Sequence, residues 1–243
     1  MKKEERVDIY KNAPLFEAIF EIRFPPEPSI ECQRDQYYEK IREEYPKIFV
    51  PKILSAQAPS LRSYQFKTEN EKKLIQFCIN SFSYHMYKEA YNENGFQGFS
   101  KECLKWMNSF CELYKISTLK RTGLRYINHI PIIREADNTI PINRYINFKY
   151  NLPSSIPQKF NLFQMGLTVQ KGKGKLNTLI GYKKLQDPQE TEIIVLDFDY
   201  YFEKNLKAKQ LENYLNNSHT HTKEIFWDLI TKEYKKVMKG ENK

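Results

Sequence analysis

The side chains best suited to chemistry in this sequence lie on the polar sides of three short segments, residues 16–24, 122–132 and 192–202. Apolar and polar residues alternate in each segment, which is typical of a strand with one buried face. If the three strands share one sheet, we expect their polar side chains to converge on one surface. This candidate set consists of Glu17, Glu21, Arg23, Arg125, His129, Asp197 and Asp199.

Such a cluster of mixed charge can bind a ligand or a partner, and it can also serve acid-base chemistry. The simpler interpretation, which the sequence favours, is a solvated sheet face whose cross-strand ion pairs contribute roughly 0.2 to 1 kcal/mol each. Between the two functional interpretations, binding is preferred to catalysis, because no catalytic motif accompanies these residues.

The sequence predicts no catalytic residue, no metal site and no cofactor. Asp197 and Asp199 point the same way along a strand and could share a divalent ion, but the sequence assigns no third ligand. The four cysteines form no Cys-x-x-Cys pair, so we expect them to be reduced and mostly buried. For His85 and His129 the sequence identifies no serine or cysteine partner, and therefore no nucleophilic triad is predicted.

The basic composition makes nucleic acid an alternative partner. The net charge is +9, which favours polyanions, although the lysines are spread along the chain among acidic residues. The run 171–175, Lys-Gly-Lys-Gly-Lys, resembles a phosphate-binding loop only superficially, because it joins two predicted strands and opens no helix. We interpret it as a hairpin tip. The residues that would contact nucleic acid are Lys120, Arg121, Lys171, Lys173, Lys175, Lys183 and Lys184.

The elements that position these side chains occur in a repeated order. Half-buried alternation favours an antiparallel sheet. Further strands are predicted at 63–67, 74–87, 161–170 and 176–185, and helices at 30–45, 100–116, 142–150, 209–215 and 222–238. We expect a single α+β domain, residues 1–243, whose antiparallel sheet is built from two similar halves, 12–116 and 119–238. Helices would pack on one face, as in TATA-binding-protein-like or helix-grip architectures.

Several separated motifs resemble a sporadically distributed prokaryotic family of conserved hypothetical proteins of about this length. They are residues 12–26 (NAPLFEAIFEIRFPP), 121–128 (RTGLRYIN), 196–199 (LDFD) and His219 followed by 226–231 (FWDLIT). The resemblance runs nearly from end to end, and it departs from the family pattern around residues 96–106. It implies no biochemical activity. The patchy occurrence of the family implies an accessory role, such as that of genes in mobile or host-defence cassettes.

We therefore expect a binding protein without catalytic activity that acts through a protein partner. The alternatives are nucleic-acid binding on a basic, aromatic-rich sheet surface and a small-molecule sensor with a pocket between sheet and helices. A cytoplasmic location is expected, because residues 1–6 lead into no apolar signal region. No membrane contact is expected either. The one stretch that could be mistaken for a membrane-spanning helix, residues 14–24, contains charged residues and is far shorter than the roughly 20 residues that such a helix needs.

Overall fold

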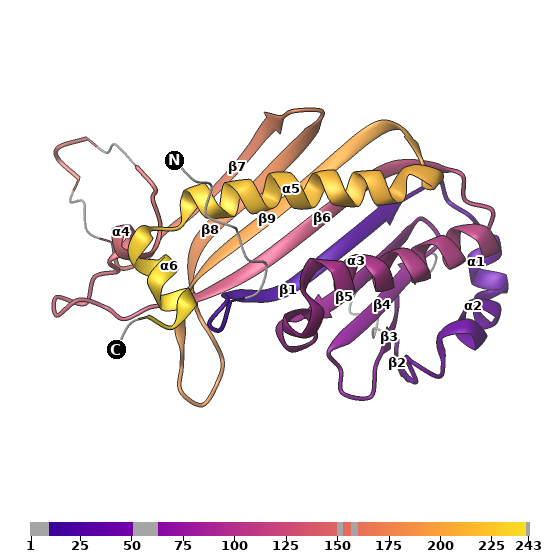
Figure 1. The fold of residues 1–243 in the computed structure, drawn as a ribbon, viewed down its shortest axis with the longest axis horizontal. Helices are drawn as coiled ribbons and strands as arrows, with labels where there is room; N and C mark the ends of the chain where they lie inside the picture. The colour runs from indigo at the N-terminus through magenta and orange to yellow at the C-terminus, as the bar shows by residue number, and fades with distance from the viewer. Residues whose placement is uncertain (1–9, 51–62, 150–152, 157–159, 242–243) are drawn as a thin grey trace.

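The centre of the computed structural model is one antiparallel sheet, seen face-on in Figure 1. The structure describes residues 10–50, 63–149, 153–156 and 160–241, and within these ranges nine strands lie in the order β2-β3-β4-β5-β1-β6-β9-β8-β7. The strands are β1 (Leu15–Arg23), β2 (Lys47–Phe49), β3 (Tyr64–Lys67), β4 (Lys73–Cys78), β5 (Ser81–Tyr87), β6 (Thr118–Pro131), β7 (Gln164–Lys171), β8 (Gly174–Lys184) and β9 (Glu192–Lys207).

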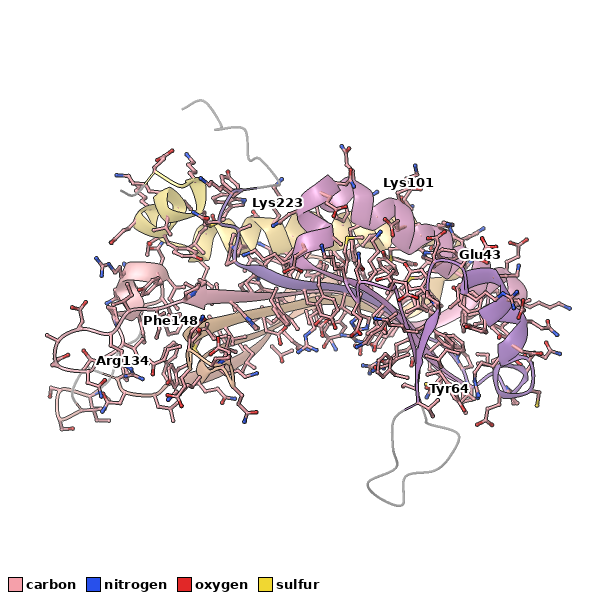
Figure 2. All side chains as sticks on the ribbon, turned by 90° about the horizontal axis from the view of Figure 1, so that it is seen from below. Glu43, Tyr64, Lys101, Arg134, Phe148 and Lys223 are labelled. Atoms are coloured by element: carbon pink, nitrogen blue, oxygen red, sulfur yellow. The ribbon has the colours of Figure 1, made fainter. Side chains whose placement is uncertain are left out.

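Two long helices lie on the same side of this sheet (Figures 1 and 2). α3 contacts β5 and β1, and α5 contacts β6 and β9, while the opposite side of the central strands is open. The helices are α1 (Ser29–Cys32), α2 (Arg34–Ile41), α3 (Lys88–Leu113), α4 (Ile142–Tyr145), α5 (Leu211–Leu229) and α6 (Lys232–Lys239), with a 3-10 turn, η2 (Ala208–Gln210), before α5.

Strand order is the same on both sides of the central β1–β6 pair. Outward from β1 it runs β5, β4, β3, and outward from β6 it runs β9, β8, β7. In each half a long helix follows the strand next to the centre, α3 after β5 and α5 after β9. The predicted α+β fold, an antiparallel sheet with helices packed on one face, is therefore confirmed.

The apolar positions of the three central strands build the core beneath the helices. Phe20, Tyr126 and Phe198 are all buried, and in the β6–β9 register Tyr126 lies directly opposite Phe198. Burying a side chain of this size contributes about 1.5 to 3 kcal/mol. The alternation seen in the sequence thus marks the buried side of each strand, but these residues belong to two neighbouring clusters: Phe20 and Tyr126 lie in one and Phe198 in the other, with Phe202 packed against both.

Two predicted strand positions differ from the structure. Residues 74–87, predicted as one strand, form β4 and β5, which turn at Ile79 and Asn80 and pair with each other. Asn80 and Ser81, residue types that favour turns, are the local signal of this break. Phe16, predicted to face the core, is 42% exposed. A β-bulge between Leu15 and Glu17 turns Phe16 toward the other face.

Two predicted helix positions are also wrong. The helix predicted at 100–116 begins at Lys88, where Tyr91 and neighbouring residues are buried, and it is interrupted at Gly95, which has φ 60° and ψ −152°. Glycine adopts this backbone conformation without steric cost. The predicted break at residues 216–218 is absent because Ser218 is buried on the sheet side of a continuous α5. The chain breaks instead at Thr231, whose hydroxyl accepts a hydrogen bond from the Tyr234 backbone N–H and caps α6.

The cysteines are free, and of those only Cys32 is exposed. Burial raises the pKa of the Cys111 thiol to about 12, which disfavours the reactive thiolate. Within the described ranges, none of the helices is both long and apolar enough to cross a bilayer. The helix predicted at 142–150 ends at Tyr145, because Ile146 is extended, and its last predicted residue, Tyr150, lies outside the described residues. Residues 1–9, on which the expected absence of a signal segment depends, also lie outside them.

Candidate functional site

The open face of the sheet, the side away from α3 and α5, carries all seven predicted site residues. They alternate along β1, β6 and β9 with the buried core residues, and these three strands are neighbours. The register places Arg125 directly opposite Asp199 and Ile127 opposite both Glu17 and Asp197. The structure therefore brings the predicted side chains onto one surface.

Arg125 is the most prominent charge on this surface. Its guanidinium donates two hydrogen bonds to Asp197, from Nε to Oδ1 at 2.8 Å and from NH2 to Oδ2 at 2.5 Å. These hydrogen bonds raise the pKa of Arg125 although its partial burial opposes the charge. The Asp197 side chain is 11% exposed and that of Arg125 is 47% exposed. A buried carboxylate thus holds an accessible guanidinium in one orientation.

Arg121 links the same surface to β1. It donates from NH1 to Glu21 Oε1 at 3.0 Å and from NH2 to Asp199 Oδ2 at 2.5 Å, and its guanidinium lies 4.3 Å from the centre of the Tyr201 ring. Burial raises the pKa of Asp199, outweighing the opposing effects of Arg121 and Arg125. From the sequence, Arg121 is expected only in the nucleic-acid alternative. Its even spacing, two residues from Gly123 and four from Arg125, is the signal that places it on this face.

Gly123 makes room for that ion pair. A Cβ at this position would lie 2.8 Å from the Tyr201 Cβ, 3.1 Å from Asp199 Oδ1 and 3.2 Å from an Arg121 nitrogen. Real Cβ atoms do not come as close as 2.8 Å, so a larger residue would shift Tyr201 and crowd the Arg121–Asp199 ion pair. The glycine is part of how this surface is built.

A hydrogen-bonded chain extends the surface toward the edge of the sheet. Thr168 on β7 donates to Asn177 on β8 at 2.9 Å, and the Asn177 amide donates to Asp199 at 3.4 Å. Above this chain lies a hollow of about 320 Å³. It is lined by Arg125, Gly166, Leu167, Thr168, Asn177, Thr178, Leu179, Asp197 and Asp199.

The other end of the surface is partly aromatic. The His129 ring stacks on Phe16 with a centroid distance of 4.2 Å, and Phe16 meets Tyr87 edge-on. Burial lowers the pKa of His129, and Lys183 adds to this effect. Glu17 makes no ion pair with an arginine in the described structure. It hydrogen-bonds to His85 on the neighbouring strand β5.

The charges of the open face are distributed unequally between its surface and its interior. Asp197 and Glu17 are buried, whereas the side chains of Arg125 and Arg23 are exposed. Arg23 also forms an ion pair with Glu21. Solvent and any partner therefore meet guanidinium groups first. Asp197 and Asp199 each bind arginine, and in the described ranges no group of three or more His, Cys, Asp or Glu residues could hold a metal ion.

The basic residues of the nucleic-acid alternative do not form one patch. Arg121 is bound to two carboxylates, and Lys171, Lys175 and Lys184 pair with Glu224, Glu203 and Glu190 at 3.1, 2.9 and 2.5 Å. The other three, Lys120, Lys173 and Lys183, have no ion pair with a described residue, and they lie on β6, in the β7–β8 turn and near the end of β8. Lys173 and Lys183 are ten residues apart along a strand, roughly 33 Å.

A second hollow lies on the helix side, where α5, α6 and the start of α3 meet the sheet. Its volume is about 100 Å³, and it is lined mainly by apolar and aromatic side chains. His219 lies within α5, where its ring stacks on Phe96 at 3.7 Å and its Nδ1 hydrogen-bonds to the Tyr126 hydroxyl at 2.9 Å. Tyr126, His219 and Trp227 are among the lining residues.

No protein-family model and no curated protein sequence matches this chain. The resemblance of its motifs to a conserved hypothetical family therefore stays a prediction.

Proposed function

We propose that this protein is a binding protein that engages a protein partner through the open face of its sheet. The observation that carries the proposal is Arg125, an exposed arginine fixed by a buried carboxylate at the rim of a hollow. Arginine is enriched at the energetic centres of protein interfaces, where a preorganised side chain loses little entropy on binding.

The donor inventory of Arg125 supports this role. A guanidinium has five N–H donors, and Asp197 takes one from Nε and one from NH2. The remaining donors suit a carboxylate or backbone carbonyl of a partner. Exposed apolar side chains lie on the same face, with Leu179 at the hollow and Phe16 at the far end. This combination of arginine with apolar and aromatic groups is typical of interface centres.

The distribution of charge favours a protein over nucleic acid. A nucleic-acid surface needs several unpaired cations along the phosphate backbone, whereas Arg23, Arg121 and Arg125 are each bound to a carboxylate of the same face. We also propose a cytoplasmic setting, which the free cysteines support because disulfides form in oxidising compartments.

Capture from a lysate of the source organism tests the proposal. The bait proteins are the wild type, Arg125→Glu, and the matched control Arg42→Glu. Arg42 lies just after α2 and pairs with Glu39, and its side chain is 56% exposed against 47% for Arg125. We expect the wild type and the control to capture at least one protein that Arg125→Glu does not capture. Nuclease treatment of the lysate should not change this result. Identical captures with all three baits would contradict the proposal, and a capture abolished by nuclease would support the nucleic-acid alternative.

The helix-side hollow favours a second function, recognition of a small aromatic molecule. Its lining offers ring faces from Tyr10, Phe198, Phe226 and Trp227 and a polar group at His219. Trp227 and Trp106 are the two tryptophans, so Trp106→Phe leaves Trp227 as the single fluorescent reporter. We expect a compound that raises the melting temperature in a thermal-shift screen to quench Trp227. Stabilisation without a fluorescence change would place the compound elsewhere.

A further inference from the structure

A serine, a histidine and a glutamate form a hydrogen-bonded row on the open face, across β5 and β1. His85 Nδ1 lies 2.7 Å from Glu17 Oε1, and His85 Nε2 lies 2.9 Å from Ser83 Oγ. The side chains of His85 and Glu17 are 14% and 11% exposed, and Ser83 is 7% exposed. The sequence alone identifies no serine partner for His85, although Ser83 stands two residues before it on the same side of the strand.

The order of contacts in this row is the one that nucleophilic serines require. A carboxylate has no proton to donate, so the proton between Glu17 and His85 is on Nδ1. Nε2 is then the acceptor and receives the hydrogen bond of the Ser83 hydroxyl. In this arrangement the carboxylate fixes the tautomer and the orientation of the imidazole, and the imidazole is placed to remove the hydroxyl proton.

Gln76 adds a donor beside the hydroxyl. It lies directly opposite Ser83 in the β4–β5 register, where cross-strand Cβ atoms are about 4.5 to 5.5 Å apart. The Gln76 side-chain oxygen accepts a hydrogen bond from Gln65 at 2.8 Å, which leaves its amide N–H groups for another acceptor. Amide side chains of this kind can stabilise the negative oxygen formed during acyl transfer.

From this geometry we propose that Ser83 is a nucleophile for acyl transfer from small esters, with His85 as the base, Glu17 as its positioning residue and Gln76 as the oxyanion donor. The activity goes beyond the proposed partner binding and does not depend on it. The low exposure of Ser83 restricts the substrate to a small acyl group. Ile19 and Leu74, which lie opposite His85 on the two adjacent strands, give that acyl group apolar neighbours.

The reaction balances with an ester and water as reactants. Ser83 Oγ bonds to the carbonyl carbon while its proton passes to His85 Nε2, and the carbonyl electron pair moves to the oxygen near Gln76. The bond to the leaving alcohol then breaks, and the alcohol takes the proton from His85. Water repeats the two steps on the acyl-serine, releasing a carboxylic acid and restoring the hydroxyl.

A fluorophosphonate probe and p-nitrophenyl acetate test the proposal with the full chain. We expect the probe to label the wild type, with Ser83 as the modified residue by peptide mass spectrometry. We expect p-nitrophenol release to fall at least 100-fold in Ser83→Ala and in His85→Gln, a loss in the usual range for a general base. Gln76→Leu tests the oxyanion donor and should slow acylation while the Ser83 hydroxyl is still present.

Ser81→Ala is the matched control. Ser81 stands on the same strand and the same face, but its hydroxyl contacts Cys78 at 3.1 Å and no histidine. We expect this variant to keep the wild-type rate. An unlabelled wild type, labelling at another residue, or equal rates in Ser83→Ala and Ser81→Ala would overturn the proposal. Because peptide mapping uses the wild type, the test holds even if Ser83→Ala fails to fold.

Discussion

Replacing Arg121 by methionine should destabilise the protein more than any exposed arginine substitution. Arg121 is 13% exposed and is the shared partner of Glu21 and Asp199. Removing one partner of a buried ion pair lowers the free energy of unfolding by about 3 to 5 kcal/mol. Because Glu21 and Asp199 keep some solvent contact, we expect Arg121→Met to lower it by about 2 to 3 kcal/mol. For a chain of this size the melting temperature should fall by about 4 to 12 °C.

The deficit should depend on pH in a defined direction. Burial already raises the pKa of Asp199, and Arg121 is the largest opposing influence, so its loss raises that pKa further. A carboxyl group whose pKa is higher in the folded state holds its proton there, and stability then falls as pH rises above the ordinary value of about 3.9. The Arg121→Met deficit should therefore be full at pH 7 and shrink as the pH approaches about 4.

Urea unfolding followed by circular dichroism at pH 7, 5.5 and 4 measures both effects. Arg42→Met is the control, because Arg42 and Glu39 are both more than half exposed and such pairs contribute about 0 to 1 kcal/mol. Equal stability of the two variants at pH 7 would refute the role given to Arg121. A deficit that grows as the pH falls would refute the role given to Asp199.

Two further substitutions test local features. Lys183→Met should raise the pKa of His129 toward its ordinary value, because Lys183 helps to lower it. A lowered histidine pKa makes the folded protein lose stability on acidification, so this variant should lose less. NMR titration of the imidazole measures the pKa, with Lys173→Met as the control. Gly174→Ala should lower the free energy of unfolding, measured with heat or urea, by about 1 to 3 kcal/mol, because the new Cβ would lie 2.7 Å from the Tyr200 ring. Gly166→Ala is the control: its Cβ would meet nothing within 4 Å, so the free energy of unfolding should change little.

The parts of the fold that follow from local pattern could be predicted from the sequence. Strand β1 and the alternating stretches of β6 and β9 repeat every two residues, so the buried side of each strand can be read without knowing its neighbours. That pattern was enough to place Arg125 and Asp197 on one face. It contains neither the register, which places Arg125 opposite Asp199, nor the side-chain directions by which Arg125 pairs diagonally with Asp197 while Asp199 binds Arg121.

The missed features depend on contacts across strands or on packing. Phe16 lies outside the core because of a β-bulge, in which one residue of β1 has no partner on β6. The bulge can be recognised only when the pairing of β1 with β6 is known. The serine row needs β5 beside β1, because Glu17 and His85 are 68 residues apart. The start of α3 at Lys88 reflects the burial of Tyr91 against the sheet, which outweighs a polar local sequence.

The most direct test of the open face as a binding surface is site-specific photo-crosslinking in cells of the source organism. A photoreactive phenylalanine analogue replaces Leu179, at the hollow beside Arg125, or Lys101, which projects from α3 on the helix side (Figure 2). The proposed function predicts a protein crosslink from position 179 that disappears when Arg125→Glu is added, and none of the same mass from position 101. A crosslink from position 101 alone would contradict it.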